Sequence, residues 1–301
     1  MGASLRGAFF STLWSRFCCN KAAQTCAECP LVAACPVSML VAPLRHESPR
    51  GRDVPRPFAL RPHSYGTEVL QPGESFVFGL TLFGWSLEWF PYVAMTLEAM
   101  GEGGIGLRVA RNGGKRGQFT VEAIQGINLF TGEAQLILQG THTWIQTPGG
   151  PTTMTMTWAD AEAWARTLPT GTLSLHFLTP LRLVDHQQLV KRPHLRPLVA
   201  RLLERHDALS QGYGGTPFDQ EHREMLLAVA DGMCLVDDET HWVDLQSFSR
   251  RQKKPTPIGG LVGRATYVGE VQPLLPLLAW GMVLQVGKDA TKGNGVYTVG
   301  D

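Results

Sequence analysis

Apolar residues in the first half of the chain follow two periods, a helical period of about 3.6 residues and a strand period of two. Residues 4–17 place apolar side chains at helical spacing, and residues 118–127 alternate between apolar and polar side chains. The elements expected in order are a helix at 4–17, strands at 57–60 and 74–83, a helix at 87–100, and strands at 118–127 and 134–138. The first half therefore follows the order α-β-β-α-β, with a hairpin at its end.

The second half has a similar order of elements. A segment rich in Thr, Pro and Gly at 147–153 is typical of a linker, and a short helix is expected at 158–166. After these come a strand at 173–177, a helix at 193–209, strands at 241–248 and 258–267, a helix at 271–282 and a strand at 296–299. The order β-α-β-β-α-β is that of a ferredoxin-like unit, and the first half has this order without its first strand. We therefore expect an α+β fold with tandem ferredoxin-like domains at residues 1–150 and 151–301.

Composition indicates a globular protein, and its charges are unevenly placed. Of 301 residues, 44% are hydrophobic and 18% are charged, which allows two cores of ordinary size. No apolar run is long enough to span a bilayer and no signal-peptide pattern is present, so we expect a cytoplasmic protein without membrane contact. The net charge is +1, yet five arginines lie within residues 45–61 and four cations within 250–254. Such patches either bind a polyanion or are ordinary solvated faces.

Five cysteines follow the first expected helix within residues 18–35. The spacing of four of them allows thiolates to surround one metal, either zinc or an iron–sulfur cluster; these are Cys19, Cys26, Cys29 and Cys35. Such a site would be structural, because four thiolates leave no open position on the metal for chemistry. The other interpretation is a set of reduced, partly buried thiols. Disulfides are not expected in a cytoplasmic protein.

A glycine-rich loop, residues 287–295, separates the last expected helix from the last strand. It contains three glycines and two lysines, namely Gly287, Gly293, Gly295, Lys288 and Lys292. The glycines allow backbone N–H groups to turn outward and the lysines add charge, so an anionic backbone is the expected ligand. A nucleotide-binding P-loop is excluded, because that motif follows a strand and ends in Lys-Ser or Lys-Thr, whereas a helix precedes this loop and Asp289 follows Lys288.

Five stretches of the chain also occur in one family in the same order. They are Leu5-Arg6-Gly7-Ala8-Phe9, the cysteine cluster, Leu175-His176-Phe177-Leu178-Thr179-Pro180-Leu181-Arg182-Leu183, Phe248-Ser249-Arg250-Arg251-Gln252, and the C-terminal segment that begins Gly259-Gly260-Leu261-Val262-Gly263. With them, nearly the whole chain resembles the CRISPR-associated endoribonucleases of the Cas-six type, a branch of the RAMP superfamily. Similar cysteine clusters occur in part of that family. The resemblance implies tandem RRM-like (RAMP) domains and an enzyme that processes precursor CRISPR RNA (crRNA).

The resemblance also implies a reaction that needs no cofactor. In that family the 2′-hydroxyl beside the scissile phosphate attacks it, leaving a 2′,3′-cyclic phosphate and a 5′-hydroxyl, which requires a base, nearby cations and an acid. A histidine often lies in or after the first helix, so His46 is the expected base, with Arg45 or Arg52 at the phosphate and His63 as second choice. The residues expected to bind RNA, besides the basic face of 193–209, are Arg250, Arg251, Lys253, Lys254, Gly287, Lys288, Lys292, Gly293 and Gly295.

Three departures from the family pattern leave alternatives open. Gln285 stands where many members have a histidine, Lys292 stands where an aromatic residue is common, and the strand that usually precedes the first helix is missing. The alternative function is therefore a catalytically silent RNA-binding subunit of a CRISPR effector complex. A third hypothesis, a metal-dependent nuclease or redox protein built on residues 19–35, lacks an accompanying cluster of carboxylates. The expected partners are CRISPR repeat RNA and other effector subunits.

Overall fold

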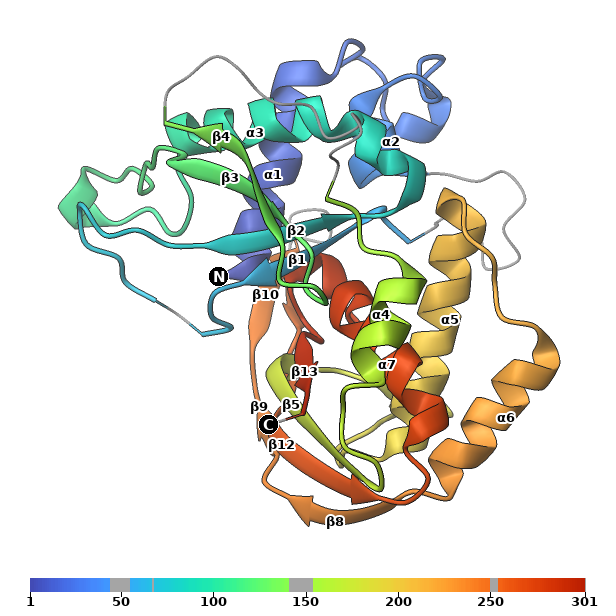
Figure 1. Ribbon diagram of the computed structural model, residues 1–301. Helices are drawn as coiled ribbons and strands as arrows, with labels where there is room; N and C mark the ends of the chain where they lie inside the picture. The colour runs from blue at the N-terminus through green and yellow to red at the C-terminus, as the bar shows by residue number, and fades with distance from the viewer. Residues whose placement is uncertain (44–54, 67, 141–153, 250–253, 301) are drawn as a thin grey trace.

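The computed structural model describes residues 1–43, 55–66, 68–140, 154–249 and 254–300. Within them the chain forms an α+β structure, as the two periods predict. Its two halves lie one above the other in Figure 1, with the first half at the top. The expected linker at 147–153 and the domain boundary at residue 150 lie outside the described residues. Across the described stretches, no helix is both long and apolar enough to cross a membrane.

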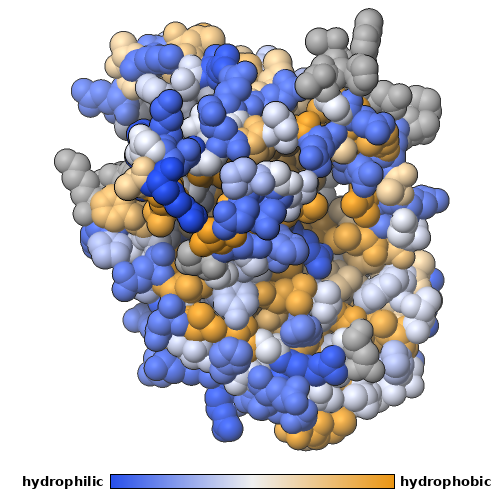
Figure 2. All heavy atoms as spheres, turned by 90° about the vertical axis from the view of Figure 1, so that its left-hand side faces the viewer, coloured by the Kyte–Doolittle hydropathy of each residue, from blue (hydrophilic) through white to orange (hydrophobic). Residues whose placement is uncertain are grey.

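One antiparallel sheet organises the second half. Its strands are β5 (Thr172–Leu181), β8 (Cys234–Asp238), β9 (His241–Val243), β12 (Gly260–Val268) and β13 (Tyr297–Val299). The order across the sheet is β13-β5-β12-β8, and β9 pairs with the beginning of β12. The sheet leaves one face open, and hydrophilic residues are frequent on this side of the second half in Figure 2.

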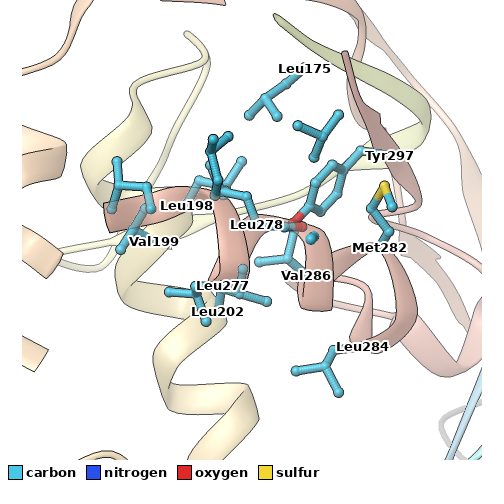
Figure 3. Packing of buried hydrophobic residues seen from close by; sticks show 14 of the residues in the cluster. Leu175, Leu198, Val199, Leu202, Leu277, Leu278, Met282, Leu284, Val286 and Tyr297 are labelled. Carbon is cyan, nitrogen blue, oxygen red and sulfur yellow. The ribbon is translucent and has the colours of Figure 1, made fainter. Parts of the chain in front are cut away.

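Helices cover the other face of the sheet (Figure 1). They are α4 (Trp158–Ala165), α5 (Leu195–Tyr213) and α7 (Leu275–Leu284), and α6 (Gln220–Asp231) packs against α5. Alternation along β5 determines which face they cover, because Leu175 and Phe177 are buried under the helices whereas His176 is exposed. Figure 3 shows part of the resulting core, to which the sheet contributes Leu175 and Tyr297, α5 contributes Leu202, and α7 contributes its leucines.

Helices and two hairpins form the first half. The helices are α1 (Gly2–Phe17), α2 (Pro36–Val41) and α3 (Phe90–Gly103), and the strands are β1 (Phe58–Pro62), β2 (Phe78–Leu82), β3 (Ala123–Ile127) and β4 (Ala134–Gln139). Among the described residues, β1–β2 and β3–β4 are two separate sheets and not one four-stranded sheet. Leu5, Phe9 and Leu13 of α1 form the core with Phe58 and Leu60 of β1.

Short elements connect these larger ones. They are the strands β6 (Val184–Asp185), β7 (Gln188–Leu189), β10 (Gln246–Ser249) and β11 (Lys254–Pro257), and the 3₁₀ helices η1 (Cys26–Glu28), η2 (Gly84–Trp89), η3 (Ala110–Asn112), η4 (Gln272–Leu274) and η5 (Ala290–Lys292). The carboxylate of Asp244 accepts a hydrogen bond from the Trp242 indole at 3.0 Å. The strand expected at 241–248 is interrupted at Asp244 and Leu245 and is therefore wrong as a single element. Its second part forms the separate β10–β11 hairpin.

The two halves meet where α7 ends and the next residues reach β1. Gln285 is buried, and its amide nitrogen donates to the carbonyl oxygen of Leu60 at 2.6 Å. The backbone of Gln285 has a φ of 59° and a ψ of 163°, a region that is essentially restricted to glycine. The hydroxyl of Tyr213 at the end of α5 makes a second connection, donating to Pro55 O at 2.6 Å.

We expect Gln285→Ala to lower the free energy of unfolding by about 1–3 kcal/mol, because it leaves the buried Leu60 carbonyl without its donor. Urea unfolding followed by circular dichroism measures the change. Gln272→Ala is the matched control, because Gln272 is exposed and should change stability little. Equal stability of the two variants would show that the bond between the halves contributes nothing.

Candidate functional site

The glycine-rich loop packs against the first half of the chain. It leaves α7, contains η5, and contacts both α1 and β1. Gly293 has a φ of 84°, and a Cβ at this position would overlap the ring of Pro62 in β1. A Cβ at Gly2 of α1 would likewise overlap the carbonyl oxygen of Lys292. Glycine at 293 is therefore required both by the backbone conformation and by the close approach of the two halves.

The hydrogen bonds of the loop correct one expectation from the sequence. The N–H of Gly293 donates to Ala290 O at 3.0 Å, and the N–H of Gly295 donates to Pro180 O at 3.1 Å. Lys288 likewise donates its N–H to Arg182 O at 2.9 Å. These three donors satisfy internal carbonyl groups and do not turn outward. Because Gly293 and Gly295 are also buried, the loop presents its side chains and not these N–H groups to a ligand.

Side chains from three segments gather positive charge around this loop. Burial lowers the pKa of Arg6 in α1, the nearby charge of Arg56 lowers it further, and Asp289 in the loop opposes both effects. Lys292 forms an ion pair of 2.8 Å with Asp289, and Lys288 is exposed. We call these five residues the junction cluster. It holds four cations and one acid, and it brings together residues more than 280 positions apart.

The base of the β10–β11 hairpin lies beside the same loop. The buried side chain of Asn294 donates to Ile258 O, immediately after β11, at 2.7 Å. The guanidinium of Arg182 donates to Gly259 O at 2.9 Å and lies 5.8 Å from the ring centre of Trp242. The base of the hairpin therefore contacts the glycine-rich loop, which carries three of the five residues of the junction cluster.

The hairpin carries an aromatic side chain that the sequence prediction missed. Phe248 in β10 is 66% exposed, and it pairs with the exposed Pro255 in β11. Lys254 is also exposed, whereas Arg250, Arg251 and Lys253 lie outside the described residues. The available signal was the position of Phe248 directly before the basic run, because an aromatic ring beside cations is typical of surfaces that bind single-stranded nucleic acid.

The basic face expected on helix 193–209 is largely neutralised. Arg196 pairs with Asp231 of α6 at 2.8 Å, and Arg201 pairs with Glu204 at 2.9 Å. Arg205 is directed into the protein, where its Nε donates to Leu284 O at 2.7 Å, and burial lowers its pKa to about 10. The expectation that this face binds RNA is therefore wrong for the buried Arg205 and stays a prediction for Arg196 and Arg201.

The candidate catalytic residues lie in two places relative to the cluster. His46, Arg45 and Arg52 lie outside the described residues, and the residues on either side of that segment are joined by a hydrogen bond of 2.8 Å from Arg56 Nε to Val41 O. His63 is exposed and directly follows Pro62, which packs on Gly293. Arg56, which follows the segment with His46, thus belongs to the junction cluster. Pro62, which precedes His63, packs against the loop that carries the other part of the cluster.

Two further side chains from the sequence analysis have defined surroundings. His176 is on the open face of the sheet, between Arg264 of β12 and Thr298 of β13 in the strand register. Gln285, which occupies the position of a family histidine, is buried against Leu60. In this chain that position therefore contributes to packing between the halves.

Cys18, Cys29 and Cys35 lie near Cys26, and Cys19, which the spacing predicts as a ligand, is not among these neighbours. Burial raises the pKa of the Cys26 thiol, and the neighbouring Cys35, Cys18 and Cys29 raise it further. Cys19 is exposed, and its thiol donates to Phe17 O at 3.6 Å. In the described part of the chain, no three His, Cys, Asp or Glu side chains are placed so as to hold a metal ion. The donors suit a soft metal, whereas their positions do not form a closed site.

Two family models match the chain. Residues 1–149 match AF_1859_N, described as an N-terminal domain, and residues 175–297 match the family described as CRISPR-associated endoribonuclease Cas6. Residues 175–297 are therefore similar to the Cas6 endoribonucleases. The resemblance drawn from the sequence is confirmed, and the protein is an RNA-binding endoribonuclease of CRISPR RNA processing.

Solved Cas6 structures share the fold at low sequence identity. A product complex of the Thermus thermophilus Cas6 is 16% identical, with a TM-score of 0.53 over 98% of this chain and 90% of that chain. A Cas6-RT-Cas1–Cas2 complex is 15% identical, with a TM-score of 0.50 over 81% of this chain and 24% of that chain. No curated protein sequence matches the chain. At these identities the structural likeness shows the fold alone.

We expect Asp289→Asn to increase RNA affinity up to about fivefold at low salt, because the partly buried ion pair with Lys292 is worth on the order of 1 kcal/mol and its loss frees Lys292 for a phosphate. Asparagine tolerates the positive φ of 66° at this position. Fluorescence anisotropy with labelled repeat RNA measures the change, with Glu270→Gln as control. The gain should disappear at high salt, and a lower affinity would show that Asp289 mainly maintains the shape of the loop.

Proposed function

We propose that the protein binds the stem-loop of the CRISPR repeat in precursor crRNA and cuts it without a catalytic metal. The mature guide RNA would end in a 2′,3′-cyclic phosphate. The junction cluster carries this proposal, because it concentrates four cations, one of which is Arg56 shortly after the segment with His46, on a loop that packs against Pro62 next to His63. A phosphate that develops negative charge during cleavage is stabilised by fixed cations of this kind.

The proposed reaction is a transesterification. A histidine takes the proton of the 2′-hydroxyl, whose oxygen forms a bond to phosphorus while the bond from phosphorus to the 5′-oxygen breaks. The 5′-oxygen takes a proton and leaves as a hydroxyl. His46 is the proposed base, with Arg45 or Arg52 at the phosphate, and His63 is the second candidate. Arg6, Lys288 and Lys292 would hold the RNA backbone through the reaction.

The RNA stem-loop is proposed to follow the surface from the junction cluster to the β10–β11 hairpin. Arg250, Arg251, Lys253 and Lys254 supply charge along the hairpin, and the exposed ring of Phe248 offers a surface on which a base can stack. Gly293 contributes by allowing the loop to approach β1, whereas Gly287 packs closely on Arg182 and Gly295 on Val286, which keeps the loop compact. Other CRISPR proteins are proposed as partners, supported by the similar fold within a Cas6-RT-Cas1–Cas2 complex.

We expect the purified protein to cut its repeat RNA in excess EDTA, and His46→Ala to lower the single-turnover rate by about 10²–10⁴-fold while RNA affinity stays unchanged. The product's cyclic phosphate is identified by mass spectrometry. RNA with a 2′-deoxy nucleotide at the cut should bind without being cleaved. His63→Ala is the matched variant that tests the second candidate.

The outcomes separate three explanations. Full activity of His46→Ala with loss of activity in His63→Ala would transfer the base to His63. Cleavage that EDTA abolishes would contradict the metal-independent mechanism. Tight RNA binding with no cut by the unmodified protein would establish the silent subunit of a CRISPR complex instead.

We also propose a structural metal, zinc or an iron–sulfur cluster, at the cysteine cluster. Cys26, Cys29 and Cys35 remain as proposed ligands. The fourth is Cys18 or Cys19, and the position of Cys18 near Cys26 favours Cys18. The metal would shape the connection between α1 and α2 and would take no part in cleavage.

We expect Cys18→Ser to reduce the metal content measured by elemental analysis and to lower the melting temperature, while Cys19→Ser retains both. The reason is that removing one of four thiolates opens the site, whereas the thiol of Cys19 is exposed and donates to Phe17 O. The reverse result would restore Cys19 as the ligand. Protein without metal in either variant or in the unmodified chain would leave the cysteines as free thiols and end the metal proposal.

A further inference from the structure

Helix α1 carries two exposed aromatic side chains that neither core uses. Phe10 is 38% exposed and Trp14 is 41% exposed. They lie four residues apart, so their side chains are on one face of the helix, about one turn from each other. The buried residues Leu5, Phe9 and Leu13 occupy a different face of the same helix. The two rings are therefore available to a ligand.

Each of these rings has a cation beside it. The guanidinium of Arg6 lies 5.8 Å from the ring centre of Phe10. The amino group of Lys21, in the loop after α1, lies 5.5 Å from the ring centre of Trp14. We call these four residues the α1 stripe. Rings interleaved with cations are the combination on which single-stranded nucleic acids stack their bases and place their phosphates.

The charge of this region favours a polyanion over another protein surface. The first acidic residue of the chain is Glu28, so the whole of α1 and Lys21 lie in a segment without a carboxylate. A protein that covered the stripe would bury the charges of Arg6 and Lys21 together with the rings. Residues 1–27 contain no carboxylate that could neutralise these two charges. RNA supplies a phosphate with every nucleotide, together with a base for each ring.

The stripe is continuous with the junction cluster. Arg6 belongs to both. Its guanidinium interacts with the charges of Arg56 and Asp289, and the same group lies over the ring of Phe10. An RNA strand held at the junction cluster can thus extend from Arg6 onto the rings of Phe10 and Trp14.

We infer that the α1 stripe binds a single-stranded segment of the RNA, with bases stacked on Phe10 and Trp14 and phosphates near Arg6 and Lys21. This inference rests on the proposed function and adds a second contact region to the cleavage site. The spacing of about 5–6 Å between residues four apart in a helix suits two splayed bases of a single strand better than two bases stacked on each other. The stripe increases affinity for the RNA flanking the stem.

The test compares two double variants that differ in their aromatic surface. Phe10→Leu with Trp14→Leu keeps an apolar face but removes both rings, and Phe10→Tyr with Trp14→Phe keeps both rings. We expect the leucine pair to lose on the order of tenfold or more in affinity for repeat RNA with its single-stranded flanks, because each stacked base contributes about a factor of five or more. The aromatic pair should stay close to the unmodified protein. Leu107→Ala, at a residue 79% exposed in the first half, is the control.

A second measurement does not rely on comparing the affinities of the two double variants. Trp14 is replaced by the photo-crosslinking residue p-benzoylphenylalanine, and the product is analysed after irradiation with RNA. A crosslink to a nucleotide outside the stem supports the inference. Unchanged affinity of the leucine pair, or a crosslink to a second copy of the chain, overturns it while leaving RNA binding elsewhere intact. Failure of the unmodified protein to bind the RNA at all would instead refute the proposed function, and the inference with it.

Discussion

The loop after α7 joins the two halves, and the arrangement of the candidate site depends on this joint. Gln285 holds a backbone conformation that non-glycine residues adopt at a cost, and its side chain bonds to Leu60 of β1. Gly293 follows and allows the ring of Pro62 to approach the loop. The loop therefore sits between α1, β1 and the sheet of the second half. Without this contact, the cations of the first half would lie far from those of the loop.

The internal hydrogen bonds of the loop determine what it can offer a ligand. Its N–H groups at Lys288, Gly293 and Gly295 satisfy carbonyl groups of the protein, so these three donors are already paired. Recognition of an anion is then left mainly to side chains, and two of the four cations of the junction cluster come from the first half. Under the proposed function, a phosphate held by all four cations therefore requires both halves in place.

The sequence predicts elements that local patterns define, and it fails where distant segments meet. Alternation along β5 and the position of the glycine-rich loop follow from neighbouring residues. The approach of Arg6 to Asp289 does not, because it depends on how α1 packs against a loop near the other end of the chain. For the same reason, spacing alone does not distinguish Cys18 from Cys19 as the fourth proposed metal ligand. Helix α6 was missed because only Leu226 and Ala230 of its residues are buried, which leaves a weak apolar period.

The crowding of like charges at the junction cluster favours an anion as its ligand. Burial and the charge of Arg56 both lower the pKa of Arg6, which means that the charged form of Arg6 is less favourable here than in water. Asp289, which also pairs with Lys292, opposes these two effects without cancelling them. Under the proposed function, a bound phosphate supplies further negative charge, and a ligand that binds only the folded protein stabilises it by mass action. The cations whose repulsion costs free energy in the free protein would then stabilise the packing of the two halves when the RNA backbone is bound.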